Sequence, residues 1–204
     1  MRLVARHAFD AERRTDENSS LDEDEKTLAD VTLLYRQAYP DGDDSGPSIP
    51  SNVGDVRRQL GAGFVPDFAD RLENRLGVDV VRVNGLRTDY CLVVEGRPII
   101  VLAATPNRFR ENFSLAHELG HLALAHHDAG DCGTNSAVER AANSFAAELL
   151  MPADSLQEID WQSITPAQLA RHVWEWGVST EALATRLAGP FIWHRRSRPA
   201  HAWR

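Results

Sequence analysis

A helix that must be buried, yet carries two imidazoles and a carboxylate, constrains this chain more than any other segment does. Residues 113–127 read FSLAHELGHLALAHH, and apolar or small side chains surround His117, Glu118 and His121. A helix that is apolar almost all round lies in a protein core. Buried histidines and carboxylates need partners, because an unpaired buried polar group costs free energy. The segment therefore predicts a polar site on a core helix, and its apolar neighbours argue against a solvated helix that matches a motif by chance.

The spacing of the two histidines predicts a metal site. His117 and His121 are four residues apart, and four residues of an α-helix turn through about 400°, so both imidazoles lie on one face. Zinc accepts two such nitrogens at about 2.0–2.1 Å. Glu118 points beside that metal, where it can hold and deprotonate a water molecule. We therefore predict zinc ligands at His117 and His121 and a general base at Glu118.

A catalytic zinc needs a third protein ligand, and Glu139 is the candidate we favour. It follows a loop long enough to reverse the chain, and Asn143 comes four residues later on the same helix face. From there the Asn143 amide can hold a zinc-bound histidine through its other ring nitrogen. The alternative is that Glu139 belongs to a capping box begun by Ser136 and only serves the helix N-terminus.

Other ligands remain open. His127, ten residues after His117, stands where an H-E-x-x-H-x-x-G-x-x-H pattern has its last histidine, with His126 directly before it, but Leu124 stands where that pattern has a glycine. A continuing helix would carry both away from the site, so they more simply mark a polar helix end. Cys132 offers a thiolate in a Gly-Asp-Cys-Gly loop, and Glu148 offers a carboxylate that we expect to face solvent.

The rest of the chain alternates helical and extended patterns. Helical spacing and capping signals mark residues 20–38, 53–60, 66–76, 108–126, 137–150 and two short segments within 165–187. Three β-branched runs fall within 78–103, and Glu95-Gly96 separates the last two as in a hairpin. We expect an α+β protein, mostly helical, with a small three-stranded, mainly antiparallel sheet. Residues 1–19 are polar, and we expect no stable element there.

Composition excludes several classes of protein. A net charge of −8 argues against a general binder of nucleic acid or of membrane surfaces. Two cysteines are too few for a disulfide framework and favour a reducing compartment. The N-terminus has no apolar signal region, and no run approaches the roughly 18 apolar residues of a membrane span. We expect a soluble, cytoplasmic protein.

Two stretches, NRFRENFSLAHELGHLALAHH and ERAANSFAAELLMP, closely resemble the ImmA/IrrE family of metallo-endopeptidases. The resemblance covers about residues 52–190. It implies a zincin-like metalloprotease domain of the gluzincin kind. It also implies a set of residue roles, namely zinc binding by His117, His121 and Glu139 and general-base catalysis by Glu118. Asn143 stands where related enzymes can have aspartate, and an amide adds no charge to the histidine that it supports.

The resemblance also implies a kind of substrate. Family members act on regulatory proteins, commonly a helix-turn-helix repressor, and examples control mobile elements or DNA-damage responses in bacteria. We therefore expect a zinc-dependent endopeptidase with a protein substrate of this kind. A donor that stabilises the transition state should exist. The sequence offers four candidates without choosing among them, Tyr90, Arg110, His172 and His194.

These observations predict a chain of three parts. Residues 1–51 form an acidic helix and a flexible linker, because PDGDDSGPSIPSN has almost nothing to bury. We favour the interpretation that the acidic helix is a solvated, charged helix. The alternatives are that it docks a partner or that it covers the cleft. Residues 52–152 form the metalloprotease domain. Residues 153–204 form a helical, helix-turn-helix-like segment with an Arg-rich tail.

Two rival functions stay open. One is a DNA-binding regulator, because residues 166–187 resemble a helix-turn-helix. The charge of its second helix is wrong for a groove reader, since Arg186 is the only cation and Glu181 is close by. We therefore do not expect direct nucleic-acid binding. The other rival is a non-catalytic interaction protein with structural zinc. An intact Glu118 argues against it, and only three good ligands are visible, whereas structural zinc sites usually have four protein ligands.

Overall fold

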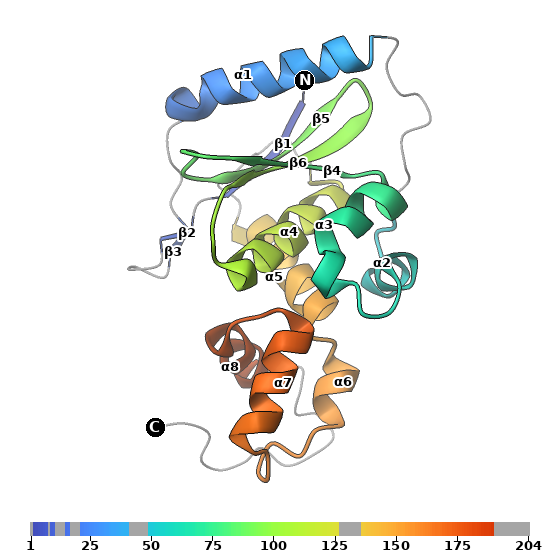
Figure 1. The fold of residues 1–204 in the computed structure, drawn as a ribbon, viewed down its shortest axis with the longest axis vertical. Helices are drawn as coiled ribbons and strands as arrows, with labels where there is room; N and C mark the ends of the chain where they lie inside the picture. The colour runs from blue at the N-terminus through green and yellow to red at the C-terminus, as the bar shows by residue number, and fades with distance from the viewer. Residues whose placement is uncertain are drawn as a thin grey trace.

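The structure is a computed structural model that describes residues 2–7, 9–10, 15–16, 21–40, 49–126 and 136–189. A four-stranded sheet has helices on both faces, so the predicted α+β class is confirmed (Figure 1). Its strands are β1 (Arg2–His7), β5 (Asp89–Val94), β6 (Arg97–Ala103) and β4 (Asp79–Val83), in that order. A separate short hairpin pairs β2 (Phe9–Asp10) with β3 (Thr15–Asp16).

The helices fall close to the predicted ranges. In chain order they are α1 (Leu21–Ala38), α2 (Val53–Leu60), η1 (Val65–Asp67), α3 (Phe68–Arg71), η2 (Leu72–Leu76), α4 (Arg108–Ala123), α5 (Ser136–Leu150), α6 (Ala153–Gln157), α7 (Pro166–Trp176) and α8 (Thr180–Ala188). The single helix expected over 66–76 is helical throughout but passes from a 3-10 turn through an α turn to a π turn. The short α6, which begins directly after Pro152, was not expected.

The sheet has the three expected strands and one more. β5 and β6 pair antiparallel across Glu95-Gly96, where both residues have positive φ (49° and 83°), as a tight hairpin turn requires. β4 pairs parallel with β6, and β1 pairs antiparallel with the other edge of β5. The expectation of no element in residues 1–19 was therefore wrong. The backbone N–H and C=O groups of β1 pair with those on the edge of β5. Because β5 lies far along the chain from residues 2–7, the local sequence pattern does not reveal this pairing.

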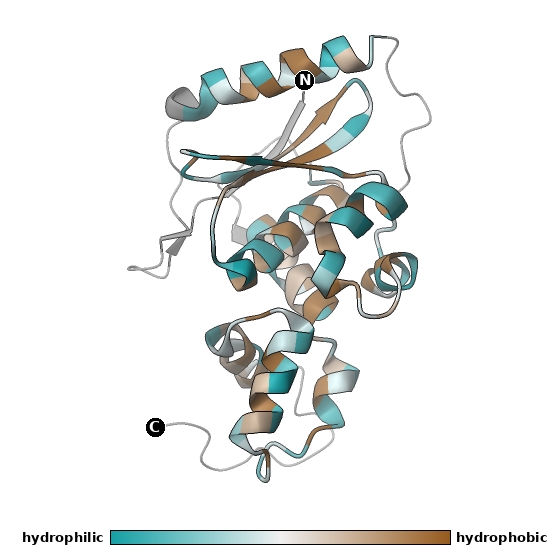
Figure 2. Cartoon of the chain, viewed as in Figure 1, coloured by the Kyte–Doolittle hydropathy of each residue, from teal (hydrophilic) through white to brown (hydrophobic). Residues whose placement is uncertain are grey.

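Alternating side chains of β5 and β6 build two cores on the two faces of the sheet. Tyr90, Leu92 and Ile99 face the core under α1, whereas Cys91 and Ile100 face the larger core formed with α4 and α5. This division follows from the two-residue period of a strand. A sheet buried on both faces has nearly continuous apolar strands, which is the pattern of β5 and β6 in Figure 2.

Helix α1 covers the face of the sheet opposite α4 (Figure 1). It buries Leu28 and Val31 against the strands, and the Tyr90 hydroxyl donates a 2.6 Å hydrogen bond to the Asp24 carboxylate. The solvated acidic helix that we favoured is therefore solvated on its outer face only, and its other face packs on the sheet. A cover over the α4 site is excluded, because the sheet lies between α1 and α4.

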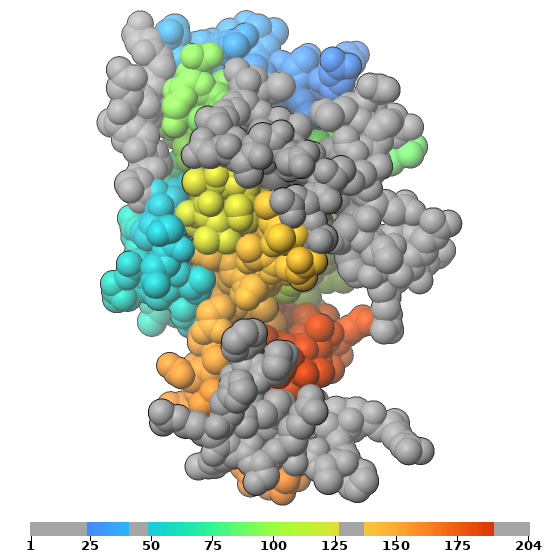
Figure 3. Space-filling model, turned by 180° about the vertical axis from the view of Figure 1, so that it is seen from behind, coloured from blue at the N-terminus to red at the C-terminus, as the bar shows by residue number. Residues whose placement is uncertain are grey.

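The C-terminal helices form the end of the molecule away from α1, as both views show (Figures 1 and 3). Thr165 and Gln168 form a capping box at the start of α7, and Gly177 ends it in the left-handed conformation (φ 61°). The Asn112 side-chain amide on α4 donates to the Gly177 carbonyl at 3.1 Å. Val173 of α7 joins the same core as α4 and α5. The turn between α7 and α8 is therefore packed against the helix that carries the histidines.

No helix in the described part of the chain is both long and apolar enough to cross a membrane.

Candidate metal centre

Helix α4 holds the H-E-x-x-H residues in the interior. Its N-cap is Asn107, whose side chain accepts hydrogen bonds from the Phe109 and Arg110 backbone N–H groups. Its middle is buried between the sheet and α5, and the polar residues of the motif are buried with it, at 1% exposure for His117, 0% for Glu118 and 0% for His121. The predicted polar site on a core helix is present.

Gly120 lies where α4 and α5 come closest. A Cβ atom added to Gly120 would lie 3.2 Å from the Ala142 carbonyl oxygen and 3.2 Å from the Phe145 Cβ atom. Both distances are shorter than ordinary van der Waals contact, so a methyl group would need small shifts of its neighbours and a larger side chain would press α5 away. The close packing of the two helices brings Glu139, on the first turns of α5, beside the histidines of α4.

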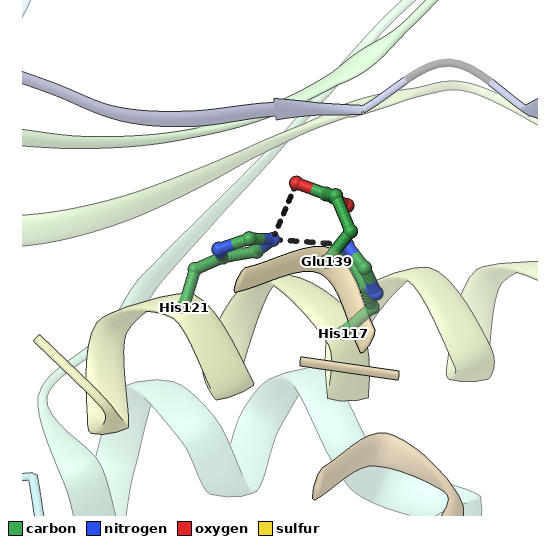
Figure 4. Close-up of side chains that lie close together, drawn as sticks. All are labelled: His117, His121 and Glu139. Carbon is green, nitrogen blue, oxygen red and sulfur yellow. Dashed lines mark hydrogen bonds and ion pairs between the residues drawn. The ribbon is translucent and has the colours of Figure 1, made fainter. Parts of the chain in front are cut away.

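His117, His121 and Glu139 converge on one point (Figure 4). The Nε2 atoms of His117 and His121 are 3.0 Å apart. The Glu139 Oε2 atom lies 3.4 Å from the His117 Nε2 atom, and the Glu139 Oε1 atom lies 3.5 Å from the His121 Nε2 atom. All of the ligand atoms lie within 4.8 Å of one another. The structure therefore brings together the three residues that the sequence proposed as ligands.

Asn143 determines which nitrogen of His117 faces that point. Its amide oxygen lies 3.1 Å from the His117 Nδ1 atom. An amide oxygen only accepts hydrogen bonds, so His117 carries its proton on Nδ1 and presents a lone pair at Nε2. Asn143 thus occupies the supporting position expected from the sequence. The other histidine, His121, has a neighbour of its own, because the His126 Nδ1 atom lies 3.0 Å from the His121 Nδ1 atom.

The donor set fits a divalent cation. A lone pair on each Nε2 atom and an anionic carboxylate would repel one another at these separations without a positive charge between them. In a tetrahedral site with bonds of about 2.0–2.1 Å, neighbouring ligand atoms are about 3.3 Å apart. The separation of the two Nε2 atoms (3.0 Å) and the separation of each Nε2 atom from its nearer Glu139 oxygen (3.4 and 3.5 Å) are of this size, although the nearer oxygen is a different one for each histidine. Two imidazoles and one carboxylate suit zinc, and they accept other divalent ions as well.

Glu118 is buried beside this group without a hydrogen-bond partner. Both of its carboxylate oxygens are inaccessible, and neither has a partner within the described ranges. A buried carboxylate with nothing to bind is costly. A group that arrives with a substrate, such as an attacking water molecule, would satisfy it.

Asp89 is a second buried carboxyl group in this region, and it was not among the residues predicted from the sequence. Burial raises the pKa of Asp89 above its ordinary value, and the negative charge of Glu118 raises it further. The Ser114 hydroxyl, the Ala103 N–H group (2.8 Å) and the Arg110 charge act in the opposite direction. The only signal in the sequence is an acidic residue at the start of an apolar strand, and that signal is common at strand ends.

Of the alternative ligands, His126 and Glu148 lie among the described residues, and neither joins the converging group. His126 contacts the far nitrogen of His121 and does not join the converging group. Glu148 forms an ion pair with Arg186 and accepts a 3.2 Å hydrogen bond from the Ala153 N–H group. His127 and Cys132 lie outside the described residues.

The candidate transition-state donors are distributed over the molecule. The Tyr90 hydroxyl is bound to Asp24 on the opposite face of the sheet. His172 stacks on Trp176 within α7, with ring centroids 5.0 Å apart. Arg110 is exposed at the start of α4, and its charge acts on Asp89. His194 lies outside the described residues. Arg110 is therefore the candidate with an electrostatic link to this region.

Comparison with known families gives one match. The model of peptidase M78, described as the IrrE N-terminal-like domain, matches residues 73–188. No curated protein matches the chain. The matched residues run from η2 to the end of α8, include the converging group and Glu118, and make up more than half of the chain. They confirm the resemblance to the ImmA/IrrE family. The chain therefore belongs to the peptidase M78 family, the IrrE N-terminal-like domain, and its function is of the metallopeptidase type.

Proposed function

We propose that this protein is a zinc-dependent endopeptidase that cleaves a regulatory protein, such as a helix-turn-helix transcriptional repressor. The observation that carries the proposal is the convergence of His117, His121 and Glu139 beside the buried Glu118. Membership of a peptidase family supports hydrolysis of a peptide bond. The resemblance to ImmA/IrrE proteins supports the choice of a repressor as substrate.

The proposed ligands would hold the ion between α4 and α5. His117 and His121 would bind through their Nε2 atoms and Glu139 through its carboxylate, while Asn143 keeps the His117 ring in its orientation. Zinc bound there supplies Lewis-acid polarisation of the carbonyl group that is attacked. Because both histidines are almost fully buried, little bulk water competes at the ligand nitrogens.

Glu118 is the proposed general base. Its carboxylate takes a proton from water while the water oxygen forms a bond to the peptide carbonyl carbon. The carboxylic acid so formed gives the proton to the peptide nitrogen as the C–N bond breaks, which regenerates the carboxylate. The absence of a competing partner for either Glu118 oxygen among the described residues supports this role. A hydrogen-bonded or ion-paired carboxylate would be a weaker base.

The rival proposal is a non-catalytic zinc-containing interaction protein or DNA-binding regulator, and the paired helices α7 and α8 are the observation in its favour. Arg186, the only cation of α8, is engaged by Glu148 and by the Met151 carbonyl of the adjoining segment. That engagement leaves α8 without a positive side chain to meet a phosphate backbone. The endopeptidase proposal therefore ranks first.

Two measurements on matched variants test the proposal. The first is metal content per chain in the purified wild type and in Glu118→Gln, Glu139→Ala and His127→Ala. We expect one zinc in the wild type, Glu118→Gln and His127→Ala, and loss of zinc in Glu139→Ala. The second compares newly formed protein N-termini in cells that produce either the wild type or Glu118→Gln. We expect N-termini that only the wild type produces, some of them within a repressor.

The variants also separate the rivals. Zinc in both proteins with no difference in N-termini would favour the interaction protein. Zinc retained in Glu139→Ala and lost in His127→Ala would contradict the ligand set. Protection of DNA by the purified chain in a footprinting assay would favour the regulator.

A further inference from the structure

His126 is the residue of this region whose position neither the H-E-x-x-H motif nor the ligand set explains. Its Nδ1 atom lies 3.0 Å from the Nδ1 atom of His121, and the two rings meet edge to face at a centroid distance of 5.0 Å and an angle of 73°. The contact is made on the side of the His121 ring away from Nε2. His126 therefore does not approach the point at which His117, His121 and Glu139 converge.

The backbone turns sharply to make this contact possible. In a continuing helix, a residue five positions after His121 would be rotated about 140° away from it. Helix α4 instead ends at Ala123, and Ala125 adopts a left-handed conformation with φ 51°. That conformation is unfavourable for a residue with a Cβ atom and is concentrated at functional sites. Ala125 is itself exposed, so the turn buries nothing at position 125 and has the effect of returning His126 to His121.

Hydrogen-bond chemistry gives the contact a role. For His121 to present a lone pair at Nε2, its proton must be on Nδ1, and a buried N–H group needs an acceptor. The Nδ1 lone pair of His126 is in place to accept it. Asn143 does the same for His117 from α5. Each of the two histidines then has its own acceptor, one on the neighbouring helix and one on the turn that follows its own helix.

We propose that His126 is a positioning residue for the metal centre, which accepts the Nδ1 proton of His121 and so fixes the tautomer and ring orientation with which His121 binds a divalent cation. The inference rests on the proposed function, because it takes the converging group as a metal site. Outer partners of metal-bound histidines orient the ring and raise its basicity as a ligand. His126 acts through His121 and touches neither the ion nor the substrate.

The test compares variants that keep or remove the acceptor. In His126→Asn the side-chain oxygen can take the place of Nδ1, whereas His126→Phe keeps a ring and removes the acceptor. Ala125→Gly keeps the turn, because glycine adopts positive φ readily. His172→Phe removes a histidine that packs within α7 and serves as the control for loss of a histidine. Zinc affinity is measured by competition with a chromophoric chelator, and the absorption spectrum is recorded after loading with cobalt(II).

We expect zinc affinity to fall about 10- to 100-fold in His126→Phe, with a changed cobalt spectrum. We expect His126→Asn, Ala125→Gly and His172→Phe to stay close to the wild type in both measurements. Circular dichroism and thermal unfolding establish that each variant is folded.

The outcomes are distinguishable. Unchanged zinc affinity and an unchanged cobalt spectrum in a folded His126→Phe would overturn the role of His126 and leave the proposed function intact. Equal losses in His126→Asn and His126→Phe would overturn it too, because the acceptor that asparagine restores would then make no difference to zinc binding. A wild type that binds no zinc would overturn the metal site and the role of His126 together.

Discussion

The Nδ1 atom of His117 lies 3.1 Å from the amide oxygen of Asn143, across the interface between α4 and α5. A neutral amide orients the ring but adds no negative charge. Asn143→Asp should therefore strengthen zinc binding, because an ionised acceptor makes a stronger hydrogen bond and a more basic ligand. Asn143→Leu should weaken zinc binding about 10- to 100-fold. Competition titration measures both, with the exposed neighbour Ser144→Ala as the control. Equal affinity in Asn143→Leu and the wild type would contradict this role.

Gly120 should tolerate one methyl group but not a large side chain. The 3.2 Å approach of a Cβ atom to Ala142 and Phe145 requires the neighbours to move by a few tenths of an ångström. In Gly120→Ala this cost is offset by the better helix propensity of alanine, about 1 kcal/mol. Gly120→Leu should lower the free energy of unfolding by about 1–3 kcal/mol through overpacking. It should also reduce zinc content, because α5 moves away and takes Glu139 with it. Urea unfolding and metal analysis measure the two effects, and an unchanged Gly120→Leu would refute the close-packing role.

Gly177 combines a left-handed backbone with a crowded position. Its φ is 61°, and an added Cβ atom would lie 2.3 Å from the Asn112 Nδ2 atom and 2.4 Å from the Val65 Cγ1 atom. Gly63 is the matched control, because it has φ 60° and nothing within 4 Å of an added Cβ atom. Gly63→Ala should lower the free energy of unfolding by about 1–2 kcal/mol. Gly177→Ala should lose about 1–3 kcal/mol more, from overpacking. Similar losses in the two variants, measured by urea unfolding, would contradict the crowding of Gly177 against Asn112 and Val65.

Asp89 should make stability depend on pH. Burial is the main cause of the raised pKa of Asp89, and the negative charge of Glu118 adds to the shift. The folded state therefore holds the Asp89 proton more tightly than the unfolded state. The free energy of unfolding consequently falls as pH rises from about 3.9, the ordinary aspartate pKa, through the raised pKa of Asp89 in the folded state. Asp89→Asn removes that loss, and its amide oxygen can still accept from the Ala103 N–H group. Its stability advantage over the wild type should grow with pH across this window, by about 1.4 kcal/mol for each unit of the shift.

Urea unfolding of the two proteins at a series of pH values, with a chelator present throughout, measures the effect of Asp89→Asn. The chelator removes any contribution from metal release at low pH. A difference between the two proteins that does not change with pH would contradict the assignment.

Local sequence rules located most of the helices and the elements of the site. The HELGH segment predicts a buried helix because apolar side chains surround its polar ones, and α4 is that helix. The Thr165-Pro166 and Gly177 signals predict the ends of α7 because capping and left-handed termination are local effects. The proximity of Glu139 to the histidines could be proposed from the same rules, because a loop joins two helices that must share a core.

The features that escaped prediction depend on distant contacts. β1 is held by backbone pairing with β5, so the sequence of residues 2–7 alone does not indicate it. The charged composition of α1 concealed its buried face, where Leu28 and Val31 contact the sheet. Asp89 and His126 gain their significance from the fold, one through burial near Glu118 and the other through a strained turn at Ala125.

The position of α1 has a consequence for how this protein is shortened for experiments. The family match begins at residue 73, after α1 and α2 have already contributed Leu28, Val56 and Leu60 to the two cores. A fragment confined to the matched residues would retain the converging group but expose the apolar sheet face of Leu92 and Val101. Exposed apolar surface of this kind promotes aggregation. The smallest autonomous folding unit is therefore longer than the segment by which the family is recognised, and a truncated enzyme should begin ahead of α1.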